Sequence, residues 1–432
     1  MEPTQQQVAA WHEQYKTSLS GWTETIDAAK VRYAELIKNS WARSKYVVRN
    51  SPVAPDQMVI CPPHSSLNQA PNQQHRGDYG TGIFEGGSAE PVLDASGAVT
   101  GINVVLHQPR IERFVRSMKA RGFQLSVPIE QFSQSMLDIV AVHGTDVLLG
   151  DDDKPTRAYI RPGAGPGVGP WGVSFKPGYL IESSNIVFRW GSYFPDADRV
   201  YRTEGVKAVI TGVRRMFPIT GKHASNYGAA AADGNIARSM NYDELIYMAP
   251  YGIRDGEMDF SGHRFDDLMK YGAIADGPGE EVFGILKDGG TLIYTPMRTN
   301  RLGGTVLNYV ITHIAPRLGL KTVERDLTLA DIRSGEIAGL AYAGNAVKVV
   351  PIGSIDLVRP VSDTEGEKVE TLYAGGIHPT IARLRDQWED EVTGKLSPSH
   401  SSLLTPIDLK WGQEMKDYLD GYWAGLGFTQ LI

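Results

Sequence analysis

The stretch Gly221-Lys222-His223-Ala224-Ser225-Asn226-Tyr227, followed by small residues from Gly228 to Ala232, is the part of the chain on which the predicted fold depends. One lysine precedes a predicted helix over 226–240, with an amide and a phenol shortly after it. A lysine can form a Schiff base with a carbonyl compound if its surroundings remove its proton and hold it still. A single lysine is more often a solvated surface group, so the rest of the chain has to decide between the two readings.

Length and composition indicate a globular protein with more than one domain. The chain has 432 residues, of which 41% are hydrophobic, and its 43 basic and 50 acidic residues give a net charge of −7. This length predicts two domains plus extensions. The acidic balance, with no long basic run, argues against nucleic acid or an anionic membrane as the main partner.

The cysteine content and the N-terminal residues indicate the expected compartment. Cys61 is the single cysteine and cannot form an intramolecular disulfide, which fits a reducing compartment. No apolar run approaches the ~20 residues of a membrane span. The first residues lack the charged and apolar parts of a signal peptide. We therefore expect a cytoplasmic protein.

The chain divides into three predicted regions. Residues 1–50 are predicted to be a helical extension, because residues such as Trp11 and Trp41 belong to an apolar pattern of roughly helical spacing. Residues 51–195 are expected to form a small N-terminal domain that opens on a proline-rich connector. Residues 196–432 are expected to form a large C-terminal domain, with the boundary in the polar, turn-rich stretch that precedes it.

Helices and strands alternate along both domains, which predicts an α/β (α+β) fold with a sheet in the core. The predicted helices cover 110–122, 129–142, 226–240 and 305–318. The predicted strands include 101–106, 157–162, 244–248, 282–286, 292–295 and 322–327.

Two local patterns do not support a phosphate-binding loop or a metal site. The run Gly163-Ala164-Gly165-Pro166-Gly167-Val168-Gly169 could bind a phosphate, because glycines let the backbone come close to one. No amphipathic helix follows it, so we favour a mobile or close-packed loop. The ten histidines include no pair at i, i+4 spacing, which argues against a metal site.

Three further stretches are candidate anion sites. Leu302-Gly303-Gly304-Thr305-Val306 leads into a predicted helix, and free backbone N–H groups at a helix start bind phosphate well. An ordinary glycine turn explains the same residues. Arg113 could add a fork of donors to that phosphate or simply be exposed. Gly344-Asn345-Ala346 is either a plain turn before a strand or a second anion site.

Taken as an ordered set, seven short stretches resemble the branched-chain amino acid aminotransferases, which are fold type IV pyridoxal-phosphate enzymes. The resemblance extends from about residue 79 to about residue 405. The stretches are Tyr79–Gly86, Arg113 with Ser117, Ala158–Pro162, Gly221–Tyr227, Asp276–Phe283, Tyr294–Pro296 and Gly344–Pro351.

The resemblance implies a two-domain fold type IV architecture and pyridoxal 5′-phosphate as the cofactor. Lys222 would bind the cofactor as a Schiff base and then move a proton between the substrate Cα and the cofactor. Tyr227 would hydrogen-bond the phenolate oxygen, and Asp276 would pair with the pyridinium nitrogen, which makes the ring an electron sink. The groups implied to hold the phosphate are Arg113, the backbone of Thr305 and Val306, and Asn345.

The same resemblance implies the exchange of an amino group between an L-amino acid with a branched-chain or other apolar side chain and a 2-oxo acid such as 2-oxoglutarate. It also implies a homodimer with shared active sites, since Tyr79 and Val173 match positions that the partner subunit supplies. Arg161 could admit a distal carboxylate. The residues implied to bind substrate are Tyr79, Phe84, Tyr159, Arg161, Val173, Asn345 and Ala346.

Several positions depart from the family pattern and leave other reactions open. Asp276 stands where the family has glutamate, Glu281 replaces an asparagine, and Asn345 and Val306 replace threonines. Residues 254–270 resemble an insertion. A second reading is therefore elimination, racemisation or another Cα or Cβ transformation of an amino acid. A third is a non-catalytic scaffold, against which the retained lysine, phenol and arginine argue.

Overall fold

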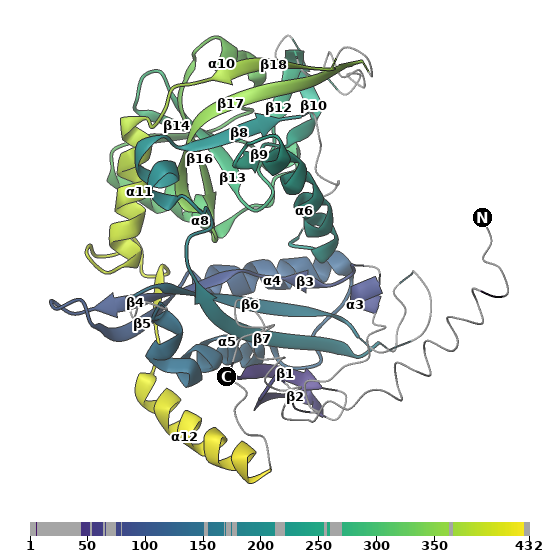
Figure 1. Cartoon of the computed structure of the whole chain (residues 1–432), viewed down its shortest axis with the longest axis vertical. Helices are drawn as coiled ribbons and strands as arrows, with labels where there is room; N and C mark the ends of the chain where they lie inside the picture. The colour runs from purple at the N-terminus through teal and green to yellow at the C-terminus, as the bar shows by residue number, and fades with distance from the viewer. Residues whose placement is uncertain are drawn as a thin grey trace.

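The computed structural model describes residue 6 and residues 45–51, 54–63, 65, 75–78, 80–150, 154–167, 169, 174, 179–211, 221–254, 257–259, 270–362 and 366–426. In this part of the chain, two large sheets with their helices form two lobes, one above the other in Figure 1. No helix among these residues is both long enough and apolar enough to cross a membrane.

The first sheet is antiparallel and has the strand order β19-β5-β4-β6-β7-β1-β2, with β3 beside β6. Its strands are β1 (Val47–Ser51), β2 (Ala54–Cys61), β3 (Ile83–Phe84), β4 (Gly87–Leu93), β5 (Val99–Val105), β6 (Arg157–Pro166), β7 (Ile181–Trp190) and β19 (Leu404–Pro406).

Amphipathic helices cover this sheet. Helix α4 (His107–Arg121) buries Ile111, Phe114 and Met118, whose spacing of three and four residues places them on one face. The ring of Phe114 stacks on that of Phe132 in α5 (Ile129–His143), with 4.7 Å between centroids. The other helical segments of this lobe are α3 (His75–Asp78), η1 (Gly144–Leu148) and α12 (Leu409–Gly425).

The second sheet is mixed and has the order β15-β14-β13-β16-β17-β8-β9, with β18 beside β17. The pairs β14–β15, β17–β8 and β8–β9 are parallel, and the others are antiparallel. The strands are β8 (Val206–Ile210), β9 (Glu244–Leu245), β13 (Glu281–Leu286), β14 (Thr291–Tyr294), β15 (Lys321–Glu324), β16 (Ile337–Gly344), β17 (Lys348–Ser362) and β18 (Gly366–Tyr373).

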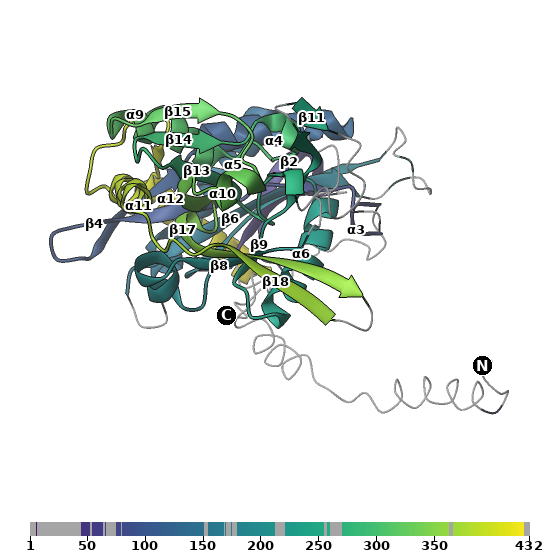
Figure 2. The same cartoon turned by 90° about the horizontal axis from the view of Figure 1, so that it is seen from above.

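Successive residues of the central strands belong to different cores, because side chains alternate between the faces of a sheet. Val282 and Leu340 lie in one core, whereas Phe283 and Ala341 lie in the other. The second core also holds the apolar faces of the helical run α8 (Thr305–Tyr309), η4 (Val310–Ile314) and α9 (Ala315–Arg317), and of α11 (Pro379–Val392). These helices lie beside the sheet in both views (Figures 1 and 2). A sheet covered on both faces reads as near-continuous apolar strands, as here.

The remaining elements of the second lobe connect these strands. A side sheet has the order β11-β10-β12. Its strands are β10 (Met248–Arg254), β11 (Glu257–Asp259) and β12 (Gly272–Ile274), and the helical segments are η2 (Arg199–Thr203), α6 (Ala224–Ser239), η3 (Met297–Thr299), α8 (Thr305–Tyr309), η4 (Val310–Ile314), α9 (Ala315–Arg317), α10 (Leu329–Arg333) and α11 (Pro379–Val392).

Three sequence expectations differ from the structure. Residues 47–50 belong to a strand rather than to the helical extension, because Val47 and Val48 pack into the core of the first sheet. The C-terminal segment returns from the second lobe to the first: β19 pairs with β5, and Gly412 of α12 packs against the backbone of Ala141. The expected loop at 163–169 is strand as far as Pro166. Most of the expected extension over 1–50, and most of the expected insertion over 254–270, lie outside the described residues.

Candidate active site

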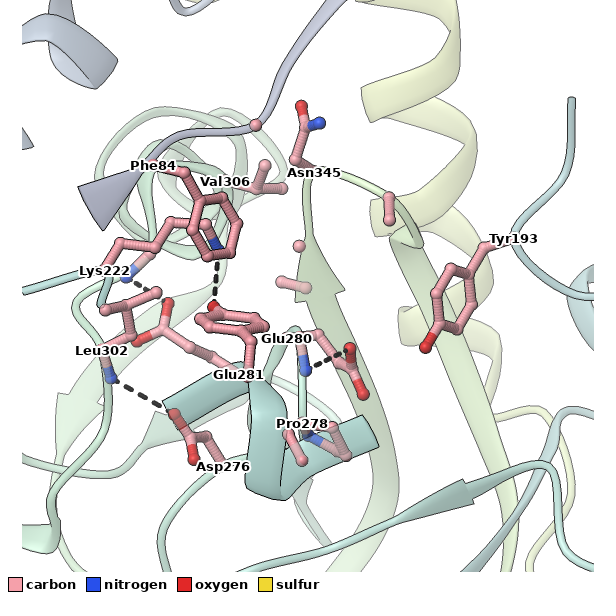
Figure 3. A pocket seen from close by; sticks show the side chains of 18 of the residues that line it. Phe84, Tyr193, Lys222, Asp276, Pro278, Glu280, Glu281, Leu302, Val306 and Asn345 are labelled. Carbon is pink, nitrogen blue, oxygen red and sulfur yellow. Dashed lines mark hydrogen bonds between the residues drawn. The ribbon is translucent and has the colours of Figure 1, made fainter. Parts of the chain in front are cut away.

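A cavity of about 670 Å³ lies between the two lobes and is lined by residues of both. The first lobe contributes side chains from β3, α4, β6 and β7. The second contributes the start of α6, the 276–281 segment, the loop into α8 and the turn between β16 and β17. Figure 3 shows Lys222 and Asp276 on one side of this cavity and Tyr193 on the other.

Lys222 is buried at the wall of the cavity and held by its neighbours. Its Nζ lies 2.5 Å from Tyr227 Oη, 4.9 Å from the centre of the Phe84 ring and 4.3 Å from that of Tyr227. The spacing of five residues works because α6 begins at Ala224 and brings Tyr227 back over the lysine. The lysine is therefore shielded from water and held in place, and both conditions favour Schiff-base chemistry at a lysine.

The backbone around Lys222 joins the two lobes, although it belongs to the second in sequence. Phe84 N donates to Lys222 O at 3.2 Å, and Ala224 N donates to Gly82 O at 2.9 Å. Lys222 N donates to Ser117 Oγ in α4 at 2.9 Å. A Cβ at Gly221 would lie 2.7 Å from Ser117 Cα, so this contact requires glycine.

His223 and Arg121 close the other side of this junction. Arg121 Nε donates to His223 Nδ1 at 2.9 Å, and Arg121 Nη2 donates to Ser225 Oγ at 2.9 Å. Burial, and then the charge of Arg121, lowers the pKa of His223 to about 4. The imidazole is therefore neutral at physiological pH and accepts a hydrogen bond from the arginine.

Arg113 reaches the cavity from α4 with its charge already paired. Its Nε and Nη2 donate to the two carboxylate oxygens of Glu85 at 2.8 and 2.6 Å. Burial is the largest single influence and lowers the pKa of Arg113, but the charge and hydrogen bond of Glu85, together with Tyr227 and Glu281, leave that pKa above the ordinary value. The described residues offer no acceptor to its Nη1, which leaves that group for an anion in the cavity.

Two carboxylates hold the loop that leads into α8. Leu302 N donates to Asp276 Oδ2 at 3.2 Å, and Gly303 N and Gly304 N donate to Glu281 at 3.1 and 2.6 Å. Asp276 is fully buried. The amides of Thr305 and Val306 follow directly and start the helix, where the backbone has no acceptor within the helix.

The turn between β16 and β17 is attached to the first lobe by two arginines. Asn345 Oδ1 accepts from Arg110 Nη2 at 2.7 Å, its Nδ2 donates to Gly87 O at 3.2 Å, and Ala346 O accepts from Arg157 Nη2 at 2.5 Å. Burial, and then the charge of Arg113, lowers the pKa of Arg110 to about 10. The side-chain polar atoms of Asn345 are therefore engaged by the first lobe.

Aromatic side chains of the first lobe line another part of the cavity, and one of them, Phe84, also faces Lys222. The guanidinium of Arg161 lies 4.6 Å from the centre of the Phe84 ring and 5.0 Å from that of Tyr159. Tyr159 also contacts Trp190, with 5.2 Å between ring centres. Within the described part of the chain, Arg161 Nε has no hydrogen-bond partner. This wall accepts apolar groups and offers one cation.

An acidic corner was not anticipated from the sequence. Tyr193 Oη donates to Glu244 Oε2 at 2.9 Å, and Glu280 lines the cavity beside them. Burial, and then the charges of Glu280 and Glu244, raises the pKa of Tyr193 well above its ordinary value. These residues come from a turn, from β9 and from the 276–281 segment, and no sequence spacing relates them.

The structure brings the anticipated site residues together. Tyr79 and Val173 lie outside the described residues. The others all line this one cavity: Phe84, Arg113, Tyr159, Arg161, Lys222, Tyr227, Asp276, Thr305, Val306, Asn345 and Ala346. Some cavity residues that received no role from the sequence lie in stretches that it did single out. Ala230 and Ala231 belong to the small-residue run after Tyr227, Glu280 belongs to the stretch Asp276–Phe283, and Trp190 closes the strand-like alternation of 179–190.

Solved structures resemble most of the chain, whereas no family model matches it and no curated protein matches its sequence. The branched-chain amino acid aminotransferase of Escherichia coli is 21% identical, with a TM-score of 0.61 over 85% of this chain and 100% of that one. That of Thermoproteus uzoniensis, solved with norvaline, is 19% identical, with a TM-score of 0.61 over 84% and 100%. That of Thermobaculum terrenum in its PLP form is 19% identical, with a TM-score of 0.62 over 84% and 99%.

The chain has the fold of the branched-chain amino acid aminotransferases. This is the fold type IV architecture that the sequence resemblance implied. The cavity volume lies within the range of roughly 300–1,000 Å³ that is typical of small-molecule sites. Its donor set fits pyridoxal 5′-phosphate: an amine beside a phenol, a buried carboxylate, and an arginine near free helix amides, all in one cavity.

Proposed function

We propose that the protein is a pyridoxal 5′-phosphate-dependent aminotransferase. It would exchange an amino group between an L-amino acid with an apolar side chain, such as a branched-chain one, and a 2-oxo acid such as 2-oxoglutarate. The observation that carries this is the position of Lys222 Nζ, 2.5 Å from Tyr227 Oη at the wall of the cavity. A shared fold alone would not require that pair.

The residues would hold the cofactor from three sides. Tyr227 Oη would donate to its phenolate oxygen, and the carboxylate of Asp276 would pair with its ring nitrogen. Its phosphate would bind Nη1 of Arg113, which has no acceptor among the described residues, and the amides at the start of α8, with Asn345 nearby. When bound, the cofactor supplies an electron sink for the bond that breaks at Cα.

Lys222 would carry out the proton movement. Its Nζ would take the Cα proton and return it on the cofactor, because the backbone bonds to Phe84 and Ser117 keep the lysine at one place in the cavity. The aromatic wall would exclude water from the apolar side chain of the substrate. The same site would have to bind an apolar amino acid and a dicarboxylic 2-oxo acid in turn. Arg161 would bind the distal carboxylate of the dicarboxylic substrate.

A homodimer with shared active sites belongs to the same proposal, because Tyr79 and Val173 match positions that a partner subunit supplies in the family that the sequence resembles. A cytoplasmic location also stays a prediction, in keeping with the single, buried Cys61.

A spectroscopic experiment tests the proposal. The purified protein with cofactor should show a visible band that borohydride bleaches, and Lys222→Ala should abolish it. Incubation with an L-amino acid alone should release stoichiometric 2-oxo acid and leave the pyridoxamine form. A colourless protein would contradict cofactor binding. Product without the pyridoxamine form would contradict transamination and favour elimination or racemisation, which the shorter Asp276 and the charge of Glu281 make worth testing.

A further inference from the structure

Glu281, at the start of β13, makes contacts that the proposed reaction leaves unexplained. Its carboxylate is buried and accepts from Arg301 Nη1 at 2.5 Å, from Gly303 N at 3.1 Å and from Gly304 N at 2.6 Å. All three donors belong to the loop that leads into α8, so one side chain fixes this loop relative to β13.

Asp276 makes a second tie between the same two segments. Leu302 N donates to Asp276 Oδ2 at 3.2 Å, which holds the loop one residue before Gly303. The proposed contact with the ring nitrogen lies at Asp276, and the proposed phosphate contacts begin at Thr305, directly after the loop. The two ties therefore determine how far apart the two ends of the cofactor site lie.

The glycine at position 304 makes room for the contact between Glu281 and the loop. A Cβ at Gly304 would lie 2.2 Å from Glu281 Oε2, so any side chain at 304 would displace the carboxylate. Arg301 neutralises the charge: its ion pair with Glu281 is 2.5 Å long, and the two side chains are 9% and 2% exposed. Without that partner, a buried carboxylate so close to a phosphate would repel it.

We propose that Glu281 is a positioning residue that sets the phosphate-binding end of the cofactor site through Arg301 and the loop amides. The inference rests on the proposed function, since it places a phosphate at the first amides after the loop. The branched-chain amino acid aminotransferases, which the sequence resembles, have asparagine at this position. An asparagine here would leave Arg301 without a counter-charge.

Glu281→Gln tests this role, because it keeps the size of the side chain but removes its charge and replaces one acceptor with a donor. The measurement is the dissociation constant of pyridoxal 5′-phosphate and of pyridoxal, which lacks the phosphate, for the full chain freed of cofactor. We expect affinity for the phosphate ester to fall about tenfold or more, and affinity for pyridoxal to fall less than about threefold.

Two further variants separate positioning from general loosening. Gly304→Ala displaces the same carboxylate without changing any charge, and should give the same selective loss. Glu182→Gln disrupts another buried pair, with Arg49 Nη2 at 2.8 Å in the first sheet, and should lower stability while leaving the ratio of the two affinities unchanged.

The outcomes are distinct. An equal loss for both compounds, or no loss, would overturn the positioning role of Glu281. A gain in affinity for the phosphate ester would also overturn it, since the carboxylate would then compete with phosphate for the loop. If the unmodified protein binds pyridoxal and pyridoxal 5′-phosphate with equal affinity, this inference alone would be overturned. One that binds neither compound would overturn the proposed function as well.

Discussion

The two sides of the cavity differ in how firmly their polar groups are held. Beside Lys222, three charged groups are tied to partners: Lys222 to Tyr227, Arg113 to Glu85, and Glu281 to Arg301. On the aromatic side, Arg161 lies over two rings, and its Nε has no hydrogen-bond partner among the described residues. Pre-arranged groups suit one invariant ligand, whereas a cation on an apolar wall can serve different substrates.

Loss of Lys222 should give the largest effect on activity. It should lower turnover of apolar and of dicarboxylic substrates alike, so that the substrate preference set by the aromatic side no longer matters. We expect Lys222→Ala to lower kcat by at least about 10³-fold for every substrate, because general acid–base groups contribute roughly 10²–10⁴. Steady-state kinetics with apolar and dicarboxylic amino acids checks this. Lys287→Ala, at an exposed lysine of the second lobe, is the control and should be unaffected. Residual turnover that depends on the substrate would contradict the role of Lys222.

Breaking the Arg113–Glu85 pair should give the second-largest effect. It should lower both the stability of the protein and its affinity for the cofactor. Arg113→Met leaves the buried Glu85 without its bidentate partner, which we expect to cost about 3–5 kcal/mol in the free energy of unfolding. Denaturant unfolding measures this. In the double variant Arg113→Met/Glu85→Gln, stability should recover in part while affinity for the cofactor stays low. Full recovery of both would show that Arg113 serves the fold alone.

A smaller and selective effect is expected on the aromatic side. Arg161→Met should lower kcat/KM for a dicarboxylic substrate about 10–100-fold, the range of one charge-assisted hydrogen bond, and change that for an apolar amino acid little. The ratio of the two kcat/KM values is the measurement, with the exposed Arg189→Met as the control. An equal loss for both substrates would place Arg161 with the cofactor instead.

The smallest effect concerns pH at the junction beside the lysine. The pKa of His223 is about 4 in the folded protein, below its ordinary value, so the unfolded chain binds a proton between about pH 6.5 and pH 4 and the folded protein does not. Stability should therefore fall as the pH falls through this window. In His223→Gln, Tm should fall less between pH 7 and pH 5, by roughly 1–3 °C. An identical fall in both proteins would rule out this contribution.

Local patterns predicted most elements but not the way in which the lobes are joined. The helix expected over 110–122 is α4 (His107–Arg121), and that expected over 226–240 is α6 (Ala224–Ser239). Periodicity finds these helices because one face of each is buried. The return of β19 to the first sheet could not be predicted, because a three-residue strand has no period and its partner β5 lies about 300 residues earlier.

The sequence by itself determined the chemistry of the cavity, in the order of seven short stretches that carry a lysine, a phenol, an arginine and a carboxylate. Only the tertiary structure decided which of these groups are tied and which are open to a ligand. Glu281, Arg301 and Gly304 are separated by as many as 23 residues and meet through a loop, and Tyr193 meets Glu244 across 51. Such contacts follow from packing between elements, which residue spacing in one chain does not encode.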